Sequence, residues 1–461
     1  MRKIETVFRI FEPLFHCGDK QSNPAGPAIN VSIESVPKQT VGVIGLGYVG
    51  LPLLMAISQS GSHGLGFDVN KSRADSLNRG KSYLKAFLDK DIQAHVATGN
   101  FEATSDMSRL AECSAILICV PTPLNKYREP DLSYIIGTTE VVAKYLKKGH
   151  LVVLESTTFP GTTNEIMKPI LEKSGLICGL DFYLAYSPER EDPGNINFTT
   201  STMPKVVGGF DEESTLRAIA VYQRFVKQTV TVSSATTAEA VKLTENIFRA
   251  VNIGLINELK MIFDRMGIDT FEVIEAAKTK PFGFMPFYPG PGWGGHCIPI
   301  DPFYLTWKAR EFGAQTKFIE LAGEINNYMP EYVVGRAASA LDMVSGRGLK
   351  GARTLIIGVA YKANVDDMRE SPALRVIEIL ARRHAIVDYH DPYVPQFELH
   401  DKVMTSKELN SEMLKNFELV IICTHHDCVD WEMVVDGSSV VVDTRNATKS
   451  VVNNRYRIFK A

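Results

Sequence analysis

The sequence predicts an α/β protein with two doubly wound units joined by a long central helix. Apolar, strand-like segments alternate with helical segments over residues 40–155 and again over residues 353–443. Such alternation is typical of parallel sheets covered by helices. Between the two stretches, residues 238–267 form the longest helical pattern in the chain. A helix of this length is expected to span between domains or between subunits.

Composition narrows the classes of protein. At 461 residues the chain is too long for one hydrophobic core, so two or three domains are expected. The net charge of only -3, with both signs interspersed, gives no general electrostatic reason to expect a nucleic acid or an anionic membrane as partner. A continuous signal-peptide core and long apolar runs are both lacking, so we expect a cytoplasmic protein. Seven widely spaced cysteines fit reduced thiols.

The first predicted strand runs into the pattern Gly45-x-Gly47-x-x-Gly50, which opens a helix. A glycine pattern between a strand and a helix indicates a dinucleotide site. Gly45 permits the tight turn, Gly47 lets the backbone approach a pyrophosphate at the helix N-terminus, and Gly50 allows close packing of helix on strand. This makes the first unit a Rossmann domain.

Asp68 ends the second predicted strand, where it would accept hydrogen bonds from the adenosine ribose hydroxyls. Its carboxylate would repel a 2′-phosphate, so NAD is favoured over NADP, although Lys71 and Arg73 are basic neighbours. The residues predicted to bind the cofactor are Gly45, Gly47, Tyr48, Val49, Gly50, Asp68, Arg73, Pro121, Thr122 and Thr157.

Two further predicted strands end in polar turns, Pro121-Thr-Pro123 and Ser156-Thr-Thr158. In open α/β sheets, ligands gather at the carboxyl ends of strands. Thr157 is therefore either a functional residue or a simple turn hydroxyl. The stretch Thr162-Thr-Asn-Glu165 has the capping-box pattern, which predicts Thr162 as a helix cap.

The stretch from Pro289 to Pro302 holds four glycines and four prolines in fourteen residues, which predicts a rigid loop. It carries one thiol, Cys297, and one carboxylate, Asp301. A thiolate is useful in an NAD-dependent oxidation that passes through an aldehyde, because it adds to the carbonyl and leads to a thioester that water cleaves. A cysteine can also be a small buried hydrophobe.

Two other stretches supply polar side chains. Lys242 and Asn246 lie four residues apart and share one helix face, and Lys242 could stabilise an oxyanion there. Asp301 could orient or deprotonate a water or hydroxyl. Glu189, fixed behind a proline, is the most constrained carboxylate of a charged loop, whereas Arg190 and Glu191 could equally form a solvated face.

The second α/β unit lacks the glycine pattern. Tyr361-Lys362, Asp366-Asp367 and Arg369 occupy its place, so side chains should hold its ligand. Cys423-Thr-His-His-Asp-Cys428 looks like a metal site, but its spacing is poor for zinc and no metal is expected.

Matching motifs occur along residues 40–450. They are Gly45-Leu-Gly-Tyr-Val-Gly50, Cys119-Val-Pro-Thr-Pro123, Glu155-Ser-Thr157, Lys242-Leu-Thr-Glu-Asn246, Gly294-Gly-His-Cys297-Ile-Pro-Ile-Asp301, and Tyr361-Lys362 with Arg369-Glu-Ser-Pro372. In this order they resemble the UDP-glucose/GDP-mannose dehydrogenase family. The resemblance implies oxidation of C6 of a nucleotide-linked hexose twice, to a uronate.

The resemblance also implies a domain division and a homodimer or higher homo-oligomer. The expected parts are an N-terminal arm (1–37), an NAD-binding Rossmann domain (38–235), a central helical dimerisation domain (236–335) and a UDP-sugar-binding Rossmann-like domain (336–461). Carried over, Cys297 is the nucleophile, Lys242 and Asn246 flank the reacting carbon, Asp301 supports water or the thiol, and Thr157 helps to place the water. The implied substrate contacts are Glu189, Arg190, Glu191, Lys242, Asn246, Gly294, Lys362 and Arg445.

Two departures bear on the substrate. The loops Ser187-Pro-Glu-Arg-Glu-Asp-Pro-Gly194 and Ile300-Asp301-Pro-Phe-Tyr304 differ from the glucose branch and look like the N-acetylhexosamine branch. Within it, residues 289–308 are most similar to the UDP-N-acetylglucosamine 6-dehydrogenases of O-antigen and capsule pathways. The same chemistry on UDP-GalNAc, UDP-ManNAc or UDP-glucose stays open, as does the choice of the carboxylate that activates water.

Two other classes of function remain. A two-electron hydroxyacid dehydrogenase of the 6-phosphogluconate type would make Cys297 incidental. A nucleotide-sugar sensor or assembly subunit would bind ligand without forming NADH, and the set of Lys242, Cys297 and Asp301 argues against it.

Overall fold

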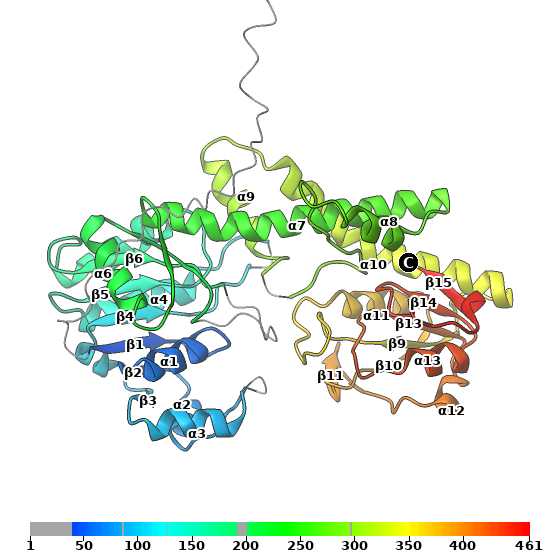
Figure 1. The fold of residues 1–461 in the computed structure, drawn as a ribbon, viewed down its shortest axis with the longest axis horizontal. Coiled ribbons are helices and arrows are strands. Elements are labelled where there is room, and N and C mark those ends of the chain that lie inside the picture. The colour runs from blue at the N-terminus through cyan, green and yellow to red at the C-terminus, as the bar shows by residue number, and fades with distance from the viewer. Residues whose placement is uncertain (1–38, 85–86, 126, 191–200, 296) are drawn as a thin grey trace, which may run out of the picture.

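The computed structural model describes residues 39–84, 87–125, 127–190, 201–295 and 297–461. Two α/β domains lie beside each other, and two long helices run above them (Figure 1). This architecture confirms the predicted fold class. The expected arm over residues 1–37 lies outside the described residues, as do Glu191 and His296.

The N-terminal domain contains an eight-stranded sheet in the order β3-β2-β1-β4-β5-β6-β7-β8. Neighbouring strands are parallel except for the β6 and β7 pair. The strands are β1 (Thr40–Ile44), β2 (His63–Phe67), β3 (Phe101–Thr104), β4 (Ala115–Ile118), β5 (Leu151–Leu154), β6 (Tyr183–Tyr186), β7 (Lys205–Gly209) and β8 (Thr229–Thr231). Strand β1 lies between β2 and β4, so the order of strands reverses beside β1 and creates a binding crevice at its carboxyl end.

Helices cover both faces of this sheet, which explains why β4 and β5 are buried along their whole length and read as continuous apolar runs. The helices are α1 (Gly50–Gln59), α2 (Lys71–Asn78), α3 (Asp89–Ala97), α4 (Ser133–Tyr145), α5 (Lys168–Leu171) and α6 (Glu212–Tyr222). Short helical turns span Met107–Glu112, Thr162–Met167 and Glu172–Ser174.

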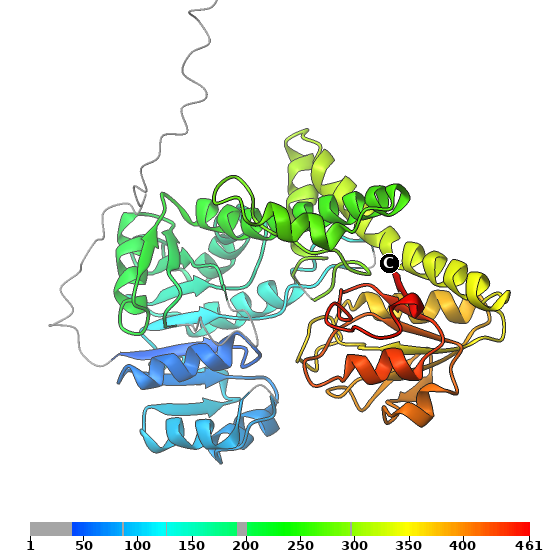
Figure 2. The same cartoon turned by 45° about the vertical axis from the view of Figure 1, so that its right-hand side comes forward.

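The central part consists of α7 (Ala235–Met266), α8 (Thr270–Ala277), α9 (Asp301–Glu311) and α10 (Lys317–Ser345). Helix α7 starts three residues before the predicted boundary because the Ser234 side chain caps it, and it ends at Gly267, whose φ is +70°. Helices α7 and α10 lie against each other in both views (Figures 1 and 2), joined by a buried hydrogen bond of 2.8 Å from Asn257 to Asn326. In the described part of the chain, no helix is long and apolar enough to cross a membrane.

The C-terminal domain contains a parallel five-stranded sheet in the order β10-β9-β13-β14-β15 and a separate hairpin. Successive residues of β9 enter opposite cores, with Ile356 on one face and Leu355 and Ile357 on the other. The strands are β9 (Arg353–Ile357), β10 (Ile386–His390), β11 (Gln396–Leu399), β12 (Lys402–Thr405), β13 (Leu419–Ile422), β14 (Val441–Asp443) and β15 (Ile458–Lys460). The helices are α11 (Pro372–Arg382), α12 (Ser411–Leu414) and α13 (Trp431–Gly437), with a short turn at Arg455–Arg457.

The predicted cap at Thr162 is wrong. The residue that precedes the helical turn is Gly161, and the Thr162 hydroxyl instead donates to the carbonyl of Phe159 at 2.9 Å. The turn is capped from a distance, because Glu239 of α7 accepts hydrogen bonds from the backbone N–H groups of Gly161 (2.6 Å) and Thr163 (2.8 Å). A local sequence pattern does not reveal a cap that arrives from another helix.

Candidate active site

The glycine loop after β1 fits a dinucleotide. A Cβ at Gly45, whose φ is +93°, would stand 2.5 Å from the carbonyl oxygen of Cys119, and a Cβ at Gly50 would overlap the carbonyl oxygen of Gly45. A Cβ at Gly47 would meet no protein atom within 4 Å. The loop therefore packs tightly at Gly45 and Gly50 but leaves its backbone open at Gly47, at the N-terminus of α1, as a pyrophosphate requires.

Asp68 follows β2 and is buried. One of its carboxylate oxygens accepts a hydrogen bond of 2.8 Å from the backbone of Asn70, and the other lies 3.8 Å from the Arg73 guanidinium. Arg73 in turn stacks over the ring of Tyr83 at 5.2 Å. The acid expected to meet the adenosine ribose is thus held at the carboxyl end of the strand next to the glycine loop.

The turn after β4 faces the glycine loop on one side and α9 on the other. Thr122 and Pro123 accept hydrogen bonds of 3.0 and 3.3 Å from the buried Tyr304 hydroxyl of α9, and Pro121 precedes them in the same turn. Thr157 lies in the neighbouring turn after β5, where Ser156 donates a hydrogen bond of 2.7 Å to the carbonyl of Val120. The turns after β4 and β5 are therefore tied together.

The loop around Cys297, within the stretch from Pro289 to Pro302, is called the cysteine loop. It packs between the two α/β domains. A Cβ at Gly294 would stand only 2.8 Å from the Cβ of Tyr361, so glycine is needed where the loop crosses the C-terminal domain. Behind Cys297 the chain turns into α9, and the backbone N–H of Asp301 donates to the Cys297 carbonyl at 2.8 Å. Asp301 is the first residue of that helix. The thiol and the carboxylate are thus one helical turn apart.

Helix α7 brings Lys242 and Asn246 to this loop. Asn246 donates a hydrogen bond of 2.5 Å to Oδ2 of Asp301. The Lys242 ammonium donates to the Glu189 carbonyl at 2.5 Å and lies 3.4 Å from its carboxylate. All four side chains are buried, and Asp301 is only 3% exposed. Residues that the sequence placed in three separate stretches therefore form one polar cluster beside Cys297.

Burial and charge set the protonation of the cluster. Burial raises the pKa of Asp301 to about 7, against the lowering effects of Lys242 and of the Asn246 hydrogen bond. Burial, aided by Asp301, raises the pKa of the Cys297 thiol to about 12 although Lys242 lowers it. Burial lowers the pKa of Lys242, but Glu189, Cys297 and Asp301 outweigh this effect and raise it. At neutral pH, Lys242 is charged, the thiol keeps its proton and Asp301 is close to its midpoint.

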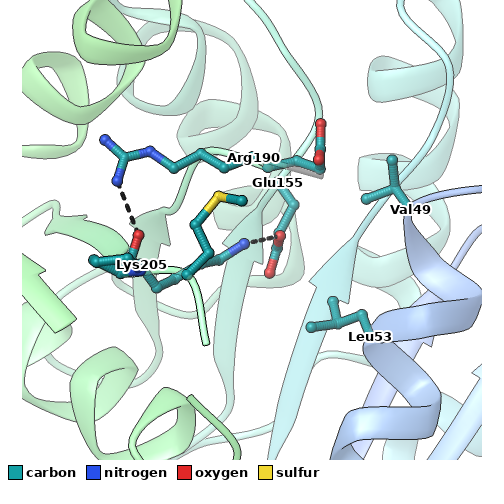
Figure 3. Close-up of a pocket in the computed structure, with 8 residues that line it drawn as sticks. Val49, Leu53, Glu155, Arg190 and Lys205 are labelled. Atoms are coloured by element: carbon teal, nitrogen blue, oxygen red, sulfur yellow. Dashed lines mark hydrogen bonds and ion pairs between the residues drawn. The ribbon is translucent and has the colours of Figure 1, made fainter. Parts of the chain in front are cut away.

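A narrow pocket lies between the glycine loop with the start of α1 on one side and the carboxyl end of β5 with the first residue of β7 on the other (Figure 3). Val49 and Leu53 form one side of it, and Glu155, Arg190 and Lys205 form the other. Glu155 and Lys205 make a buried ion pair, and Glu155 also accepts a hydrogen bond of 2.5 Å from Tyr222.

Arg190 is held by two protein partners. Its guanidinium donates to the carbonyl of Pro204 at 2.8 Å and forms an ion pair with Glu245 of α7. Both contacts engage terminal nitrogens of the side chain. Glu191, the next predicted substrate contact, lies outside the described residues.

A second hollow of roughly 760 Å³ lies between the C-terminal domain and α8. Lys362 and Arg445, both predicted from the sequence, line it. Arg445 is fixed by a hydrogen bond of 2.9 Å from its Nε to the carbonyl of Cys423. Other side chains that line it, not predicted from the sequence, include Phe271, Glu275, Lys278, Tyr288, His425 and Lys449.

Two basic residues make interactions that the sequence did not predict. Arg249 lies three residues after Asn246 on α7, and its charge lowers the pKa values of both Cys297 and Asp301. Its helical spacing from Lys242 could have identified it. Arg369 lies over the ring of Tyr48 at 5.5 Å and so joins the C-terminal domain to the glycine loop. Arg369 and Tyr48 lie far apart in the sequence, so only the folded chain brings them together.

Among the side chains that the structure describes, no group of three or more His, Cys, Asp or Glu residues could hold a metal ion.

Comparison with known proteins defines the class of enzyme. Models of the UDP-glucose/GDP-mannose dehydrogenase family match the chain over its NAD binding domain (residues 39–226), its central domain (236–328) and its UDP binding domain (355–450). The chain belongs to the UDP-glucose/GDP-mannose dehydrogenase family, and its cofactor is NAD.

Individual relatives differ in the sugar that their names state. A UDP-N-acetyl-D-glucosamine 6-dehydrogenase of Pseudomonas aeruginosa is 39% identical over 77% of this chain and 83% of its own length. A UDP-N-acetyl-D-mannosamine dehydrogenase of Pyrococcus horikoshii is 34% identical over 89% of this chain and 96% of its own. The solved structure of a UDP-D-ManNAc dehydrogenase from the same organism superposes with a TM-score of 0.83 at 33% identity, covering 91% of this chain and 98% of the other.

Proposed function

We propose that the chain oxidises C6 of UDP-N-acetylglucosamine by four electrons to the uronic acid, for the synthesis of a surface polysaccharide. The observation that carries this proposal is the buried cluster of Lys242, Asn246 and Asp301 beside the Cys297 thiol. A thiol in this position can act as the nucleophile of an oxidation that continues past an aldehyde to an acid.

In the first oxidation, Asp301 takes the proton of the C6 hydroxyl, since its pKa of about 7 lets it accept a proton near neutral pH. The Lys242 ammonium stabilises the negative charge that develops on the oxygen. Bound NAD supplies the hydride acceptor for each of the two oxidations. Loss of one proton and one hydride converts the alcohol to an aldehyde.

Before the second oxidation, Asp301 releases its first proton to solvent. It then takes the proton of the Cys297 thiol as the sulfur adds to the aldehyde carbon, and it passes this proton to the aldehyde oxygen. C6 then carries one hydroxyl and one hydrogen. Loss of that hydrogen as hydride and of the hydroxyl proton yields a thioester. Water cleaves the thioester, which releases the uronate and returns the thiol. We assign Thr157 to placing this water and either Glu189 or Asp301 to activating it.

We assign the nucleotide of the substrate to the hollow lined by Lys362 and Arg445, because two cations suit a diphosphate. The sugar would then extend along Gly294 toward Lys242 and Asn246. The segment that begins at Glu189 and Arg190 is assigned to the sugar, with Glu191 after it. The domain limits expected from the sequence stay predictions.

UDP-N-acetylmannosamine is a second candidate substrate. The high structural similarity to the Pyrococcus horikoshii enzyme favours it. The galacto epimer is a third candidate substrate, because one relative is named NDP-N-acetyl-D-galactosaminuronic acid dehydrogenase. The proposed chemistry at C6 is the same for all three sugars.

We also propose a homodimer. Exposed apolar side chains recur along α7 and α10, which support an interface on these helices. They include Phe248, Leu255, Ile262, Phe318 and Leu321.

A turnover assay with a panel of UDP-sugars, in which NADH and uronate are counted per sugar consumed, tests the proposal. Four-electron oxidation gives two NADH per sugar. A ratio of one would instead support a two-electron dehydrogenase, and nucleotide-sugar binding without NADH would support a sensor. The sugar with the highest kcat/KM identifies the substrate.

A further inference from the structure

The stretch Cys423-Thr-His-His-Asp-Cys428 has a structural position that its metal-like composition does not suggest. It follows β13 directly and lies against the start of the loop that connects β9 to α11. That loop carries Tyr361 and Lys362, which line the nucleotide hollow together with His425. The next residue, His426, is fully buried beneath the loop.

His426 makes two side-chain hydrogen bonds that fix its tautomer. Its Nδ1 lies 3.0 Å from the backbone nitrogen of Asn364, and its Nε2 lies 3.2 Å from Oδ2 of Asp391. A backbone N–H can only donate, so Nδ1 must be the acceptor. The ring proton is therefore on Nε2 and is donated to the Asp391 carboxylate.

Asp391 holds the beginning of the same loop. Its Oδ2 accepts hydrogen bonds from the backbone N–H groups of Val359 (2.7 Å) and Ala360 (3.0 Å). The carboxylate is buried, which raises its pKa, but the hydrogen bonds from His426 and the backbone outweigh burial and hold the pKa below its ordinary value. An ionised carboxylate thus anchors residues 359–360, while His426 anchors residue 364.

The rest of the stretch from Cys423 to Cys428 also holds this loop. Together with His426 and Asp391 it forms what we call the clamp. The Thr424 hydroxyl donates to the carbonyl of Ala360 at 2.6 Å. Asn364, whose φ of +62° lies in the left-handed region, exchanges two hydrogen bonds with Asp427, of 2.7 and 3.0 Å. Between these fixed points only residues 361–363 span the hollow. In the N-terminal domain the glycine loop occupies the equivalent place. Here Gly358, with a φ of +82°, makes the first turn after β9, and the buried His–Asp pair holds the residues that follow it.

We propose that His426, through Asp391 and Asn364, is a positioning residue that holds Tyr361 and Lys362 in the geometry that binds the nucleotide. This inference rests on the proposed function, because it takes the UDP moiety as the ligand of that hollow. Of the substrate, the held loop touches the nucleotide, which does not change during the reaction, and Tyr361 of the same loop also packs against Gly294 and Gly295 of the loop that carries Cys297. Loss of the clamp should therefore weaken binding of the ground state and the transition state equally, and so raise KM with kcat preserved.

The experiment measures the affinity of the full-length chain for UDP by calorimetry and the steady-state constants for UDP-sugar and NAD. Three variants separate the two hydrogen bonds. His426→Asn keeps an acceptor in the place of Nδ1, His426→Gln keeps a donor in the place of Nε2, and His426→Leu keeps neither. Cys428→Ser, at the exposed end of the same stretch, is the matched control.

We expect His426→Leu to raise the Kd for UDP and the KM for UDP-sugar by a common factor of about tenfold or more. His426→Asn and His426→Gln should show smaller increases. For all three variants the KM for NAD and the kcat at saturation should stay within about twofold of the starting values, as in Cys428→Ser. A purely structural role of His426 would lower both affinities and kcat together.

Unchanged UDP affinity in His426→Leu, or in both His426→Asn and His426→Gln should the leucine variant not fold, would overturn the positioning role alone. Equal increases in the KM values for NAD and UDP-sugar would also overturn it. If the unaltered chain does not bind UDP at all, the proposed function fails and the inference fails with it. The affinity of the unaltered chain thus distinguishes the two failures.

Discussion

Asn246 in the first half of α7 donates a hydrogen bond of 2.5 Å to Asp301, the first residue of α9. The bond joins two buried side chains from different segments of the chain. It favours the ionised form of Asp301, whereas burial disfavours that form more strongly, and the balance raises the pKa of Asp301 to about 7. Asn246 therefore helps to set the pH at which Asp301 can act as a base.

Replacing Asn246 by Ala should move the pH profile of the enzyme. The substitution removes an interaction that stabilises ionised Asp301, so the pKa of Asp301 should rise above 7. If ionised Asp301 is the base, the rising limb of kcat/KM against pH should shift to higher pH by roughly one unit. Asn252→Ala, on the same helix with an amide that donates to the Phe248 carbonyl at 2.7 Å, is the control. A limb that does not move in Asn246→Ala would assign the titration to another group.

Replacing Cys297 by Ser should separate the two oxidations. A serine hydroxyl is a far weaker nucleophile than a thiolate, so the thioester should not form, while the alcohol can still be oxidised by the NAD-dependent first step. We expect uronate formation to fall by at least about a thousandfold and the yield to approach one NADH per sugar. Mass spectrometry of the sugar and absorbance of NADH measure both. Uronate formation at the original rate would eliminate the covalent mechanism, and Cys428→Ser should keep full activity.

The sequence predicted those parts of the molecule whose signals are local. The glycine loop is one such part, because strand, turn and helix follow one another within a few residues, and Lys242 and Asn246 are another, because helical spacing alone puts them on one face. The fold class followed from the same kind of signal, repeated twice along the chain.

The missed features join residues far apart in the chain. Glu239 lies 76 residues from Thr163, which it caps, and Asp391 lies 35 residues from His426. Neither side chain carries a local mark of its partner, since a glutamate on a long helix and a histidine beside cysteines have many other uses. The short strand β15 was missed because its three residues are only half-buried and show no alternation.

Removing the cap that Glu239 supplies should destabilise the N-terminal domain. In Glu239→Ala, the buried N–H groups of Gly161 and Thr163 lose their acceptor, which should cost about 2 kcal/mol or more of the free energy of unfolding. The first unfolding transition in urea, followed by tryptophan fluorescence and circular dichroism, measures the loss. Glu258→Ala, at an exposed position of the same helix, should change stability by less than about 0.5 kcal/mol. Equal stability of the two variants would contradict the capping role.

Alanine at two positions of the glycine loop should separate cofactor binding from folding. A Cβ at Gly50 would overlap the carbonyl oxygen of Gly45, so Gly50→Ala must displace α1 from β1 and should lower the melting temperature of the chain. A Cβ at Gly47 meets no protein atom within 4 Å, so Gly47→Ala should fold with an unchanged melting temperature.

Gly47→Ala should nevertheless bind NAD weakly, because the added methyl group occupies the space through which the pyrophosphate approaches the backbone. We expect the Kd for NAD to rise by about tenfold or more, with the Kd for UDP unchanged, since the hollow lined by Lys362 and Arg445 lies in the other domain. Calorimetric titrations with each ligand, beside a thermal melt, measure all three quantities. Normal NAD affinity in a folded Gly47→Ala variant would mean that the pyrophosphate does not cross the loop at this residue, and the open backbone there would need another explanation.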